Sequence, residues 1–187
     1  MHRRDFLQTG AVVTAGVVAS STLPQSLAIA EQAVTTQAIP KRKLGRTNEE
    51  LSIIGLGGVV VMNNSPSFAS KMVAETVDRG INYFDVAPTY DNAQERLGPA
   101  LEPYRKKCFL ACKEEDWTRD GSQKLLEEPL RLLRTDYLDL YQLHALSKMS
   151  DLEQILGSNG AMETFVAAKK AARCAFSVSP RILSKWR

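Results

Sequence analysis

The chain has 187 residues, of which 44% are hydrophobic, 7% aromatic and 24% charged. This is ordinary globular composition, and it supplies enough apolar side chains for one domain with a buried core. The formal net charge is only +3, from 24 Lys and Arg against 21 Asp and Glu. Because no long basic run accompanies this balance, the charge gives no electrostatic argument for a nucleic-acid footprint or a polybasic membrane patch, and we expect no nucleic-acid partner.

The first thirty residues have the pattern of an export signal. Adjacent Arg3 and Arg4 precede a mildly apolar stretch, which is shorter than the roughly 20 residues that cross a bilayer, and Ala28 and Ala30 frame a small-x-small cleavage site. We therefore expect residues 1–30 to be a bacterial twin-arginine signal peptide, with no stable membrane span. The twin-arginine export machinery would then be a partner, and the mature protein would be periplasmic. The alternatives are an uncleaved anchor and a chance basic N-terminus.

After a small and polar linker at 31–40, the chain alternates between two kinds of apolar pattern. Short apolar runs bounded by glycine, proline or polar residues predict four buried strands, at Leu51–Leu56, Ile81–Val86, Cys108–Cys112 and Tyr137–Leu143. Each run is followed by a segment with helical spacing, at Phe68–Asp78, Asn92–Tyr104, Gly121–Arg134 and Ala161–Ala171. Pro129 is expected to bend or split the third of these helices.

The four predicted strands begin about 30 residues apart, which is typical of a repeated strand–helix unit. Such a repeat indicates a parallel sheet with right-handed crossovers, as found in doubly wound sheets and in eightfold barrels. Gly55, Gly57 and Gly58 follow the first strand as GLGG. A dinucleotide fingerprint needs a third glycine where Val60 stands, so this motif indicates a tight strand exit more than a phosphate cradle.

Four ionisable residues are placed at carboxyl ends of the predicted strands. Asp85 lies near the end of the second strand, with Tyr90 in the loop that follows. Lys113 comes immediately after the third strand and His144 immediately after the fourth. Barrel enzymes hold their active sites at this rim, so the placement favours the barrel over the doubly wound sheet.

Period-two alternation assigns faces within the third strand. Phe109 and Ala111 share a face with Lys113, whereas Cys108 and Cys112 share the opposite face. If Lys113 points into the barrel mouth, both cysteines face the helix layer. We therefore expect them to be small core residues, neither metal ligands nor a disulfide pair.

The four rim residues suit the reduction of a carbonyl group. A carboxylate at Asp85 would keep the Lys113 ammonium charged and fixed, and a fixed ammonium beside a phenol stabilises the phenolate. Tyr90 would then serve as a general acid, and His144 would donate to, or orient, the carbonyl oxygen. The hydride would come from a cofactor.

The same residues lie in segments that resemble the aldo-keto reductases. The similar segments are Lys41–Gly58, Gly80–Leu101, the LACK ending at Lys113, and RLLRTDYLDLYQLH ending at His144. The resemblance implies a (β/α)8 barrel, an N-terminal β-hairpin that closes the barrel bottom, and NADPH as hydride donor.

The residues that the resemblance assigns are few. Asp85, Tyr90, Lys113 and His144 correspond to the catalytic tetrad, with Tyr90 as proton donor. Cofactor-binding positions are Gly57, Gly58 and Asp85, and no metal is implied. The expected function is NADPH-dependent reduction of an aldehyde or ketone, as a small carbonyl substrate, to an alcohol.

The chain is short for a complete barrel, which needs about 250 residues. We expect an α/β fold that is a partial TIM-type (β/α)8 barrel, with the hairpin and about four β/α units at 41–170. Residues 171–187 show neither helical nor strand periodicity, and our hypothesis is that a frameshift near Ala171 produced this tail. The resemblance also implies that the loops that bind the cofactor's pyrophosphate and 2′-phosphate follow barrel strands later than these four.

With four parallel strands the barrel cannot close, so we expect unpaired edges at the first and fourth strands and self-association through these edges. The alternative to an active reductase is a catalytically inactive fragment, or a half-barrel binding module.

Overall fold

The computed structural model describes residues 38–177. The expected signal peptide at 1–30, most of the linker at 31–40 and the end of the tail at 171–187 lie outside these residues. Within the described part of the chain, no helix is both long and apolar enough to cross a membrane.

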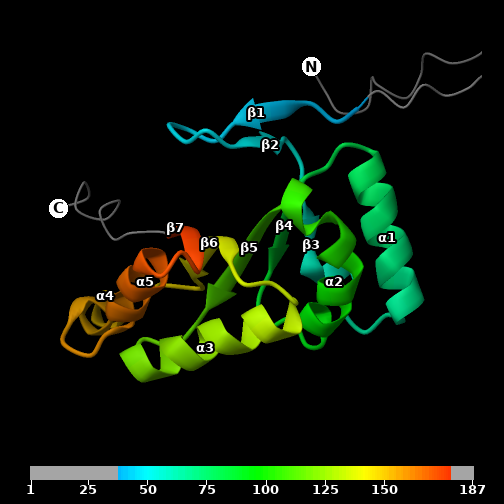
Figure 1. The fold of residues 1–187 in the computed structure, drawn as a ribbon. Helices are drawn as coiled ribbons and strands as arrows, with labels where there is room; N and C mark the ends of the chain where they lie inside the picture. Colours follow the sequence, from blue (N-terminus) through cyan, green and yellow to red (C-terminus); the bar gives the residue numbers. More distant parts are fainter. Residues whose placement is uncertain (1–37, 178–187) are drawn as a thin grey trace, which may run out of the picture. The chain divides into compact units, whose positions relative to one another are not determined.

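Five parallel strands form the main sheet, in the order β3-β4-β5-β6-β7. Their bounds are β3 (Leu56–Gly57), β4 (Tyr83–Val86), β5 (Phe109–Glu114), β6 (Leu138–Leu143) and β7 (Cys174–Ser177). Sequential strands are neighbours throughout, and helical segments fill the connections between them, as in the barrel repeat (Figure 1). This confirms the expected α/β fold as part of a (β/α)8 barrel.

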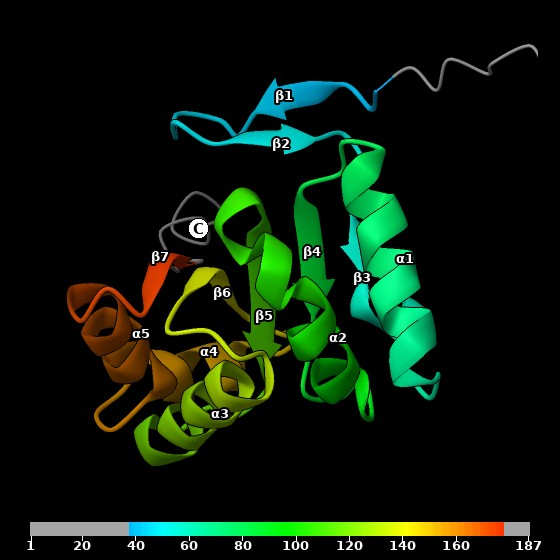
Figure 2. The same ribbon diagram turned by 45° about the vertical axis from the view of Figure 1, so that its right-hand side comes forward.

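Five α-helices and two short 3₁₀-helices connect the strands within residues 38–177. They are η2 (Gly58–Val60), α1 (Pro66–Asp78), α2 (Ala93–Leu101), η3 (Glu102–Lys107), α3 (Arg119–Leu132), α4 (Met149–Leu156) and α5 (Ala161–Lys170). Figure 2 shows α1, α2 and α3 lying along one face of the sheet. Local signals start two of them: the Ser65 hydroxyl accepts from Phe68 N before α1, and the Thr118 hydroxyl accepts from Gly121 N before α3.

A β-hairpin precedes the barrel strands, as expected. Strand β1 (Lys41–Lys43) pairs antiparallel with β2 (Glu50–Ser52). Asn82, just before β4, donates from its side chain to the Glu50 carbonyl and accepts from Ser52 N, 2.9 and 2.8 Å away. These bonds tie the hairpin to the amino-terminal ends of the barrel strands, opposite the arrowheads in Figures 1 and 2. The carboxyl ends therefore remain free for a site.

The main core lies between the sheet and the helices. Tyr141 of β6 stacks on Phe165 of α5 with ring centroids 4.6 Å apart, and both side chains are buried. Cys108 and Cys112 belong to the same core, which confirms that they face the helix layer. Burial raises the pKa of Cys108 to about 11 and that of Cys112 to about 12, so both thiols stay protonated and unreactive near neutral pH.

The first predicted strand is wrong in its extent. Leu51 and Ser52 pair with β1 in the hairpin, and the barrel strand β3 is limited to Leu56 and Gly57. Ile53 N still donates to Pro40 O, which extends the hairpin by one bond, and Ile54 and Gly55 then connect the hairpin to β3 without strand pairing. The apolar run predicted as one strand thus contributes residues to two sheets. Hydrophobicity alone does not show where the chain passes from the first sheet to the second.

Two helix predictions also need correction. Pro129 does not split α3, which continues as one helix from Arg119 to Leu132, and the alternative of a bend stays a prediction. The helix predicted to reach Tyr104 is α-helical only to Leu101 and then tightens into η3, which has a proline at its start. The helix α4 was missed, although Leu152, Ile155 and Leu156 have the spacing of one helical face.

The tail contains a strand that the sequence did not predict. Within the predicted irregular tail at 171–187, Cys174–Ser177 form β7, which pairs in parallel with β6. Phe176 stacks on Phe109 of β5, with ring centroids 6.2 Å apart. The expectation that the fourth strand would be an open edge is therefore wrong, and the described sheet has its edges at β3 and β7.

Candidate active site

The structure brings the four predicted catalytic residues to one rim of the sheet. Asp85 is the penultimate residue of β4, and Tyr90 lies in the loop between β4 and α2. Lys113 lies inside β5, one residue before its end, rather than just after the strand as predicted. His144 directly follows β6. All four positions are at carboxyl ends of parallel strands, because the sheet register aligns these ends.

Lys113 connects two of the other rim residues. Its Nζ donates to a carboxylate oxygen of Asp85 in a short ion pair, and it lies 3.4 Å from the hydroxyl oxygen of Tyr90. The same nitrogen is 5.2 Å from the centroid of the Tyr90 ring. The side chains of Lys113 and Asp85 are only 15% and 24% exposed, so water screens this pair weakly.

The environment of Lys113 favours its charged form. Burial by itself lowers the pKa of Lys113, but the hydrogen bond and charge of Asp85, helped by Tyr90, outweigh burial and raise that pKa above its ordinary value. The amine is therefore an ammonium group across the physiological pH range. A permanent positive charge beside the Tyr90 hydroxyl is the electrostatic arrangement that stabilises a phenolate.

His144 also packs against Tyr90. The two ring centroids are 6.2 Å apart and the rings are nearly perpendicular, at 87°. His144 N donates to the Glu114 carbonyl at 2.8 Å, which fixes the backbone of this residue against the end of β5. Imidazole, phenol and ammonium thus border one patch of the rim, where a carbonyl oxygen could meet both an N–H or O–H donor and a positive charge.

The two glycines predicted to bind the cofactor have different surroundings. A Cβ atom at Gly58 would come within 2.7 Å of the Val86 side chain, so packing alone explains this glycine. At Gly57, whose strand partner is Asp85, a Cβ would meet nothing closer than 3.7 Å. Packing does not explain the glycine at position 57, so its role in binding the expected cofactor stays a prediction.

Sequence reasoning missed two residues on the same face of the sheet. Tyr83 precedes Asp85 by two residues on β4, and burial, followed by the charge of Asp85, raises the pKa of Tyr83. Gln142 is the strand partner of Lys113 on β6. Period-two counting from Asp85 and from His144 finds both positions, so the signal was present. A third residue, Glu115, lies in a loop, where no periodicity could have indicated it.

Glu114 is fully buried on the opposite face of β5 from Lys113. One of its carboxyl oxygens accepts from Asp116 N at 3.0 Å, and the other has no hydrogen-bond partner among the described residues. Burial raises the pKa of Glu114 to about 8, although the hydrogen bond from Asp116 N acts in the opposite direction. The folded protein therefore holds Glu114 as a neutral acid at pH 7.

This buried acid predicts a specific dependence of stability on pH. Because folding raises the pKa of Glu114 from its ordinary 4.5 to about 8, its contribution to stability is complete below pH 4.5 and is lost as pH rises toward 8. A glutamine amide does not titrate, so it makes no pH-dependent contribution to stability. The stability advantage of Glu114→Gln over the wild type should grow by a few kcal/mol between pH 4.5 and 8, as measured by urea unfolding. A constant difference between the two proteins would show that Glu114 is charged when folded.

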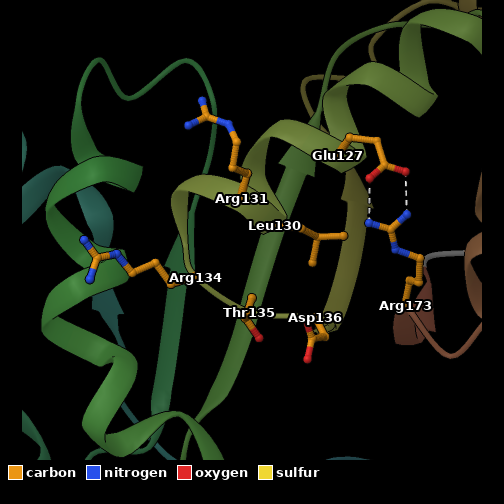
Figure 3. A pocket seen from close by; sticks show the side chains of 7 residues that line it. All are labelled: Glu127, Leu130, Arg131, Arg134, Thr135, Asp136 and Arg173. Atoms are coloured by element: carbon orange, nitrogen blue, oxygen red, sulfur yellow. Dashed lines mark hydrogen bonds and ion pairs between the residues drawn. The ribbon is translucent and has the colours of Figure 1, made fainter.

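A surface pocket of about 470 Å³ lies away from this rim, and none of its lining residues belongs to the tetrad. Figure 3 shows Glu127 and Arg173 joined by paired bonds at one side of the pocket, while Arg131 and Arg134 extend away from them. Because the three guanidinium groups do not converge, this pocket does not offer a coherent site for an anion.

The described residues also contain no group of three or more His, Cys, Asp or Glu side chains placed to hold a metal ion.

Comparison with known proteins gives the family. The sequence model of the Aldo/keto reductase family matches residues 53–179. The chain is 35% identical over 118 residues to the uncharacterized oxidoreductase YqkF of Bacillus subtilis, and 35% identical over 101 residues to the methylglyoxal reductase YeaE of Escherichia coli. These matches cover 56% and 52% of this chain, and 38% and 34% of the two relatives.

Solved structures agree with the sequence matches. The aldo-keto reductase AKR11C1 from Bacillus halodurans, in its holo form, superimposes with a TM-score of 0.65 at 25% identity, over 79% of this chain and 53% of that one. The chain belongs to the aldo/keto reductase family. Proteins of this family are oxidoreductases that generally use NADP(H), and the chain spans less than two fifths of the two curated relatives above.

Proposed function

We propose that this protein is an NADPH-dependent carbonyl reductase, with Asp85, Tyr90, Lys113 and His144 as its catalytic residues. The observation that carries the proposal is the position of the Lys113 ammonium between the Asp85 carboxylate and the Tyr90 hydroxyl. Such an arrangement serves to deliver a proton to an oxygen atom that gains negative charge.

The reduction assigns a separate task to each side chain. Tyr90 transfers its hydroxyl proton to the carbonyl oxygen, and Lys113 stabilises the phenolate that this leaves. Asp85 holds Lys113 in place, and His144 orients the carbonyl oxygen toward Tyr90. A bound nicotinamide cofactor supplies the hydride to the carbonyl carbon, so that the product is an alcohol.

Cofactor binding is the direct test of this proposal. Titration of the purified protein with NADPH should quench its tryptophan fluorescence and raise its melting temperature, because a ligand that binds only the folded state stabilises it. Addition of a carbonyl compound should then consume NADPH, as followed by its absorbance. Absence of both binding signals would count against the reductase and favour the second candidate below.

The second candidate is a catalytically inactive half barrel that acts as a binding module. Its support is the extent of the fold, because residues 38–177 contain five parallel strands where a closed barrel of this type has eight. The tetrad geometry would then be retained without turnover. Binding of a small carbonyl compound without NADPH consumption would identify this case.

Small aldehydes and ketones are the proposed substrates. The relative YeaE is named a methylglyoxal reductase, and another relative, from Novosphingobium aromaticivorans, is named a 6-dehydroglucose reductase. Methylglyoxal is therefore the first compound to assay.

Export by the twin-arginine route is a further part of the proposal, and Arg3 and Arg4 are its support. This route accepts folded cargo, so a cofactor could be loaded before export. Replacing both arginines with lysine should keep the protein in the bacterial cytoplasm, as judged by cell fractionation. If the variant and the wild type were found in the same cell fractions, the export proposal would be wrong and the reductase proposal would be unaffected.

We also propose self-association through the open strands of the sheet. Within residues 38–177, β3 and β7 each pair with only one neighbouring strand, and such edges can pair with a second copy of the chain. Light scattering of the purified protein should give the mass of a dimer or larger species. A monomeric mass at high concentration would contradict it.

A further inference from the structure

The end of β5 and the end of β6 place a carboxylate beside the imidazole of the rim. Glu114 and Leu143 are strand partners, so the next residues along the two strands, Glu115 and His144, are neighbours. The bond from His144 N to the Glu114 carbonyl continues the strand pairing to this point. The backbone therefore fixes the two side chains on the same part of the rim.

The side chains of this pair are in close contact. Nδ1 of His144 lies 2.5 Å from Oε1 of Glu115, and the two side chains are 26% and 41% exposed. Nδ1 itself is buried and makes no aligned hydrogen bond with any described residue, so the Glu115 carboxylate is the acceptor within its reach. The Tyr90 ring packs edge to face against the imidazole, and Lys113 contacts the hydroxyl of Tyr90.

This contact determines which ring nitrogen carries the proton. A carboxylate can only accept hydrogen bonds, and a neutral imidazole has one N–H group and one bare nitrogen. A bare Nδ1 would place its lone pair against the Glu115 oxygen only 2.5 Å away, and this repulsion favours the ring form with the proton on Nδ1. With its proton on Nδ1 toward Glu115, the neutral ring presents a bare Nε2 to the remaining surroundings.

We propose that Glu115 is a positioning residue that holds the proton of His144 on Nδ1 and leaves Nε2 to face the carbonyl substrate. Nε2 can then donate to the carbonyl oxygen only when the ring carries a second proton. The position of the proton on Nδ1, the first statement, concerns the ring alone. The role of Nε2 toward the substrate, the second statement, rests on the reductase function proposed above. Glu115 thus links the orientation of the substrate to the protonation of His144.

Nitrogen NMR of the full chain labelled with ¹⁵N-histidine tests the first statement. The chain contains two histidines, His2 and His144, and a His2→Asn protein assigns their signals. At a pH where the ring is neutral, wild-type His144 should show a protonated Nδ1 and a bare Nε2. Glu115→Ala should move the proton to Nε2 in most molecules. A bare Nδ1 in the wild type, or identical spectra for both proteins, would overturn the proposal.

Glu49→Ala is the matched control, because Glu49 is an exposed glutamate in the distant hairpin turn. This variant should leave the His144 spectrum unchanged, and a change would show that the spectrum does not report on Glu115. The NMR result needs no turnover, so it stands even if the protein proves not to be a reductase.

Activity measurements test the second statement. If the protein reduces carbonyl compounds, kcat/KM of the wild type should fall as pH rises through the titration of His144, measured by NMR in the same sample. In Glu115→Ala the neutral ring already offers an Nε2–H, so this fall should disappear. A pH profile that Glu115→Ala leaves unchanged would refute the link between Glu115 and substrate orientation.

Discussion

Replacing Tyr90 with phenylalanine is expected to lower the rate of carbonyl reduction by about 10²–10⁴-fold, the usual contribution of a general acid. The substitution removes only the hydroxyl group, which lies 3.4 Å from the Lys113 ammonium. The ring and its edge-to-face contact with His144 remain, so the rim should keep its shape. NADPH affinity should therefore stay within a factor of about two while turnover is lost. Steady-state rates and a fluorescence titration measure the two quantities separately.

Tyr104→Phe is the control for this experiment. Tyr104 is half-buried in η3, on an element that contributes none of the four rim residues. Its loss of a hydroxyl should leave kcat unchanged. Turnover by Tyr90→Phe at the wild-type rate would exclude Tyr90 as the proton donor, whereas a parallel loss of NADPH binding would show that the substitution disturbs the site as a whole.

The sequence was sufficient to find the rim because the rule for parallel sheets is strict. Each strand carries its carboxyl end to the same edge, so Asp85, Lys113 and His144 could be grouped from their positions relative to predicted strands. Lys113 turned out to lie within β5, yet the grouping survived, because a shift of one or two residues does not move a side chain to the other end of a strand.

The contacts across the rim could not be predicted in the same way. The approach of Glu115 to Nδ1 of His144 depends on the register between β5 and β6 and on a loop conformation, neither of which has a sequence period. The burial of Glu114 is a similar case. Two adjacent glutamates are typical of a solvated turn. In the structure, however, β5 continues to Glu114, and the carboxyl group of this residue lies in the core.

The end of the chain shows how tertiary context overrides a local pattern. CAFS is too short to display strand alternation, so Cys174–Ser177 was predicted to be irregular. The open side of β6 offers unpaired backbone groups to any extended segment that follows α5, and the buried Cys174 and the stacked Phe176 then hold the strand in register. Pairing with a pre-existing edge, rather than intrinsic preference, accounts for β7.

Replacing Arg105 with methionine is expected to lower the free energy of unfolding by about 3–5 kcal/mol. The buried guanidinium lies 2.9 Å from the Asp139 carboxylate and donates to the carbonyls of Cys108 and Tyr137. Its Cζ also lies 4.0 Å from the centroid of the Tyr137 ring. Methionine fills much of the volume but satisfies none of these acceptors, so a carboxylate that is only 18% exposed loses its counter-charge.

Urea unfolding gives the size of this loss, and an exposed ion pair provides the comparison. Arg134 contacts Glu102 at 3.0 Å, but their side chains are 56% and 54% exposed, so Arg134→Met should cost no more than about 1 kcal/mol. Adding Asp139→Asn to Arg105→Met should recover part of the lost stability, because the double variant no longer buries an unpaired charge. If Arg105→Met were as mild as Arg134→Met, Arg105 would not organise the junction of η3, β5 and β6, and the amino-terminal end of this sheet would depend on apolar packing alone.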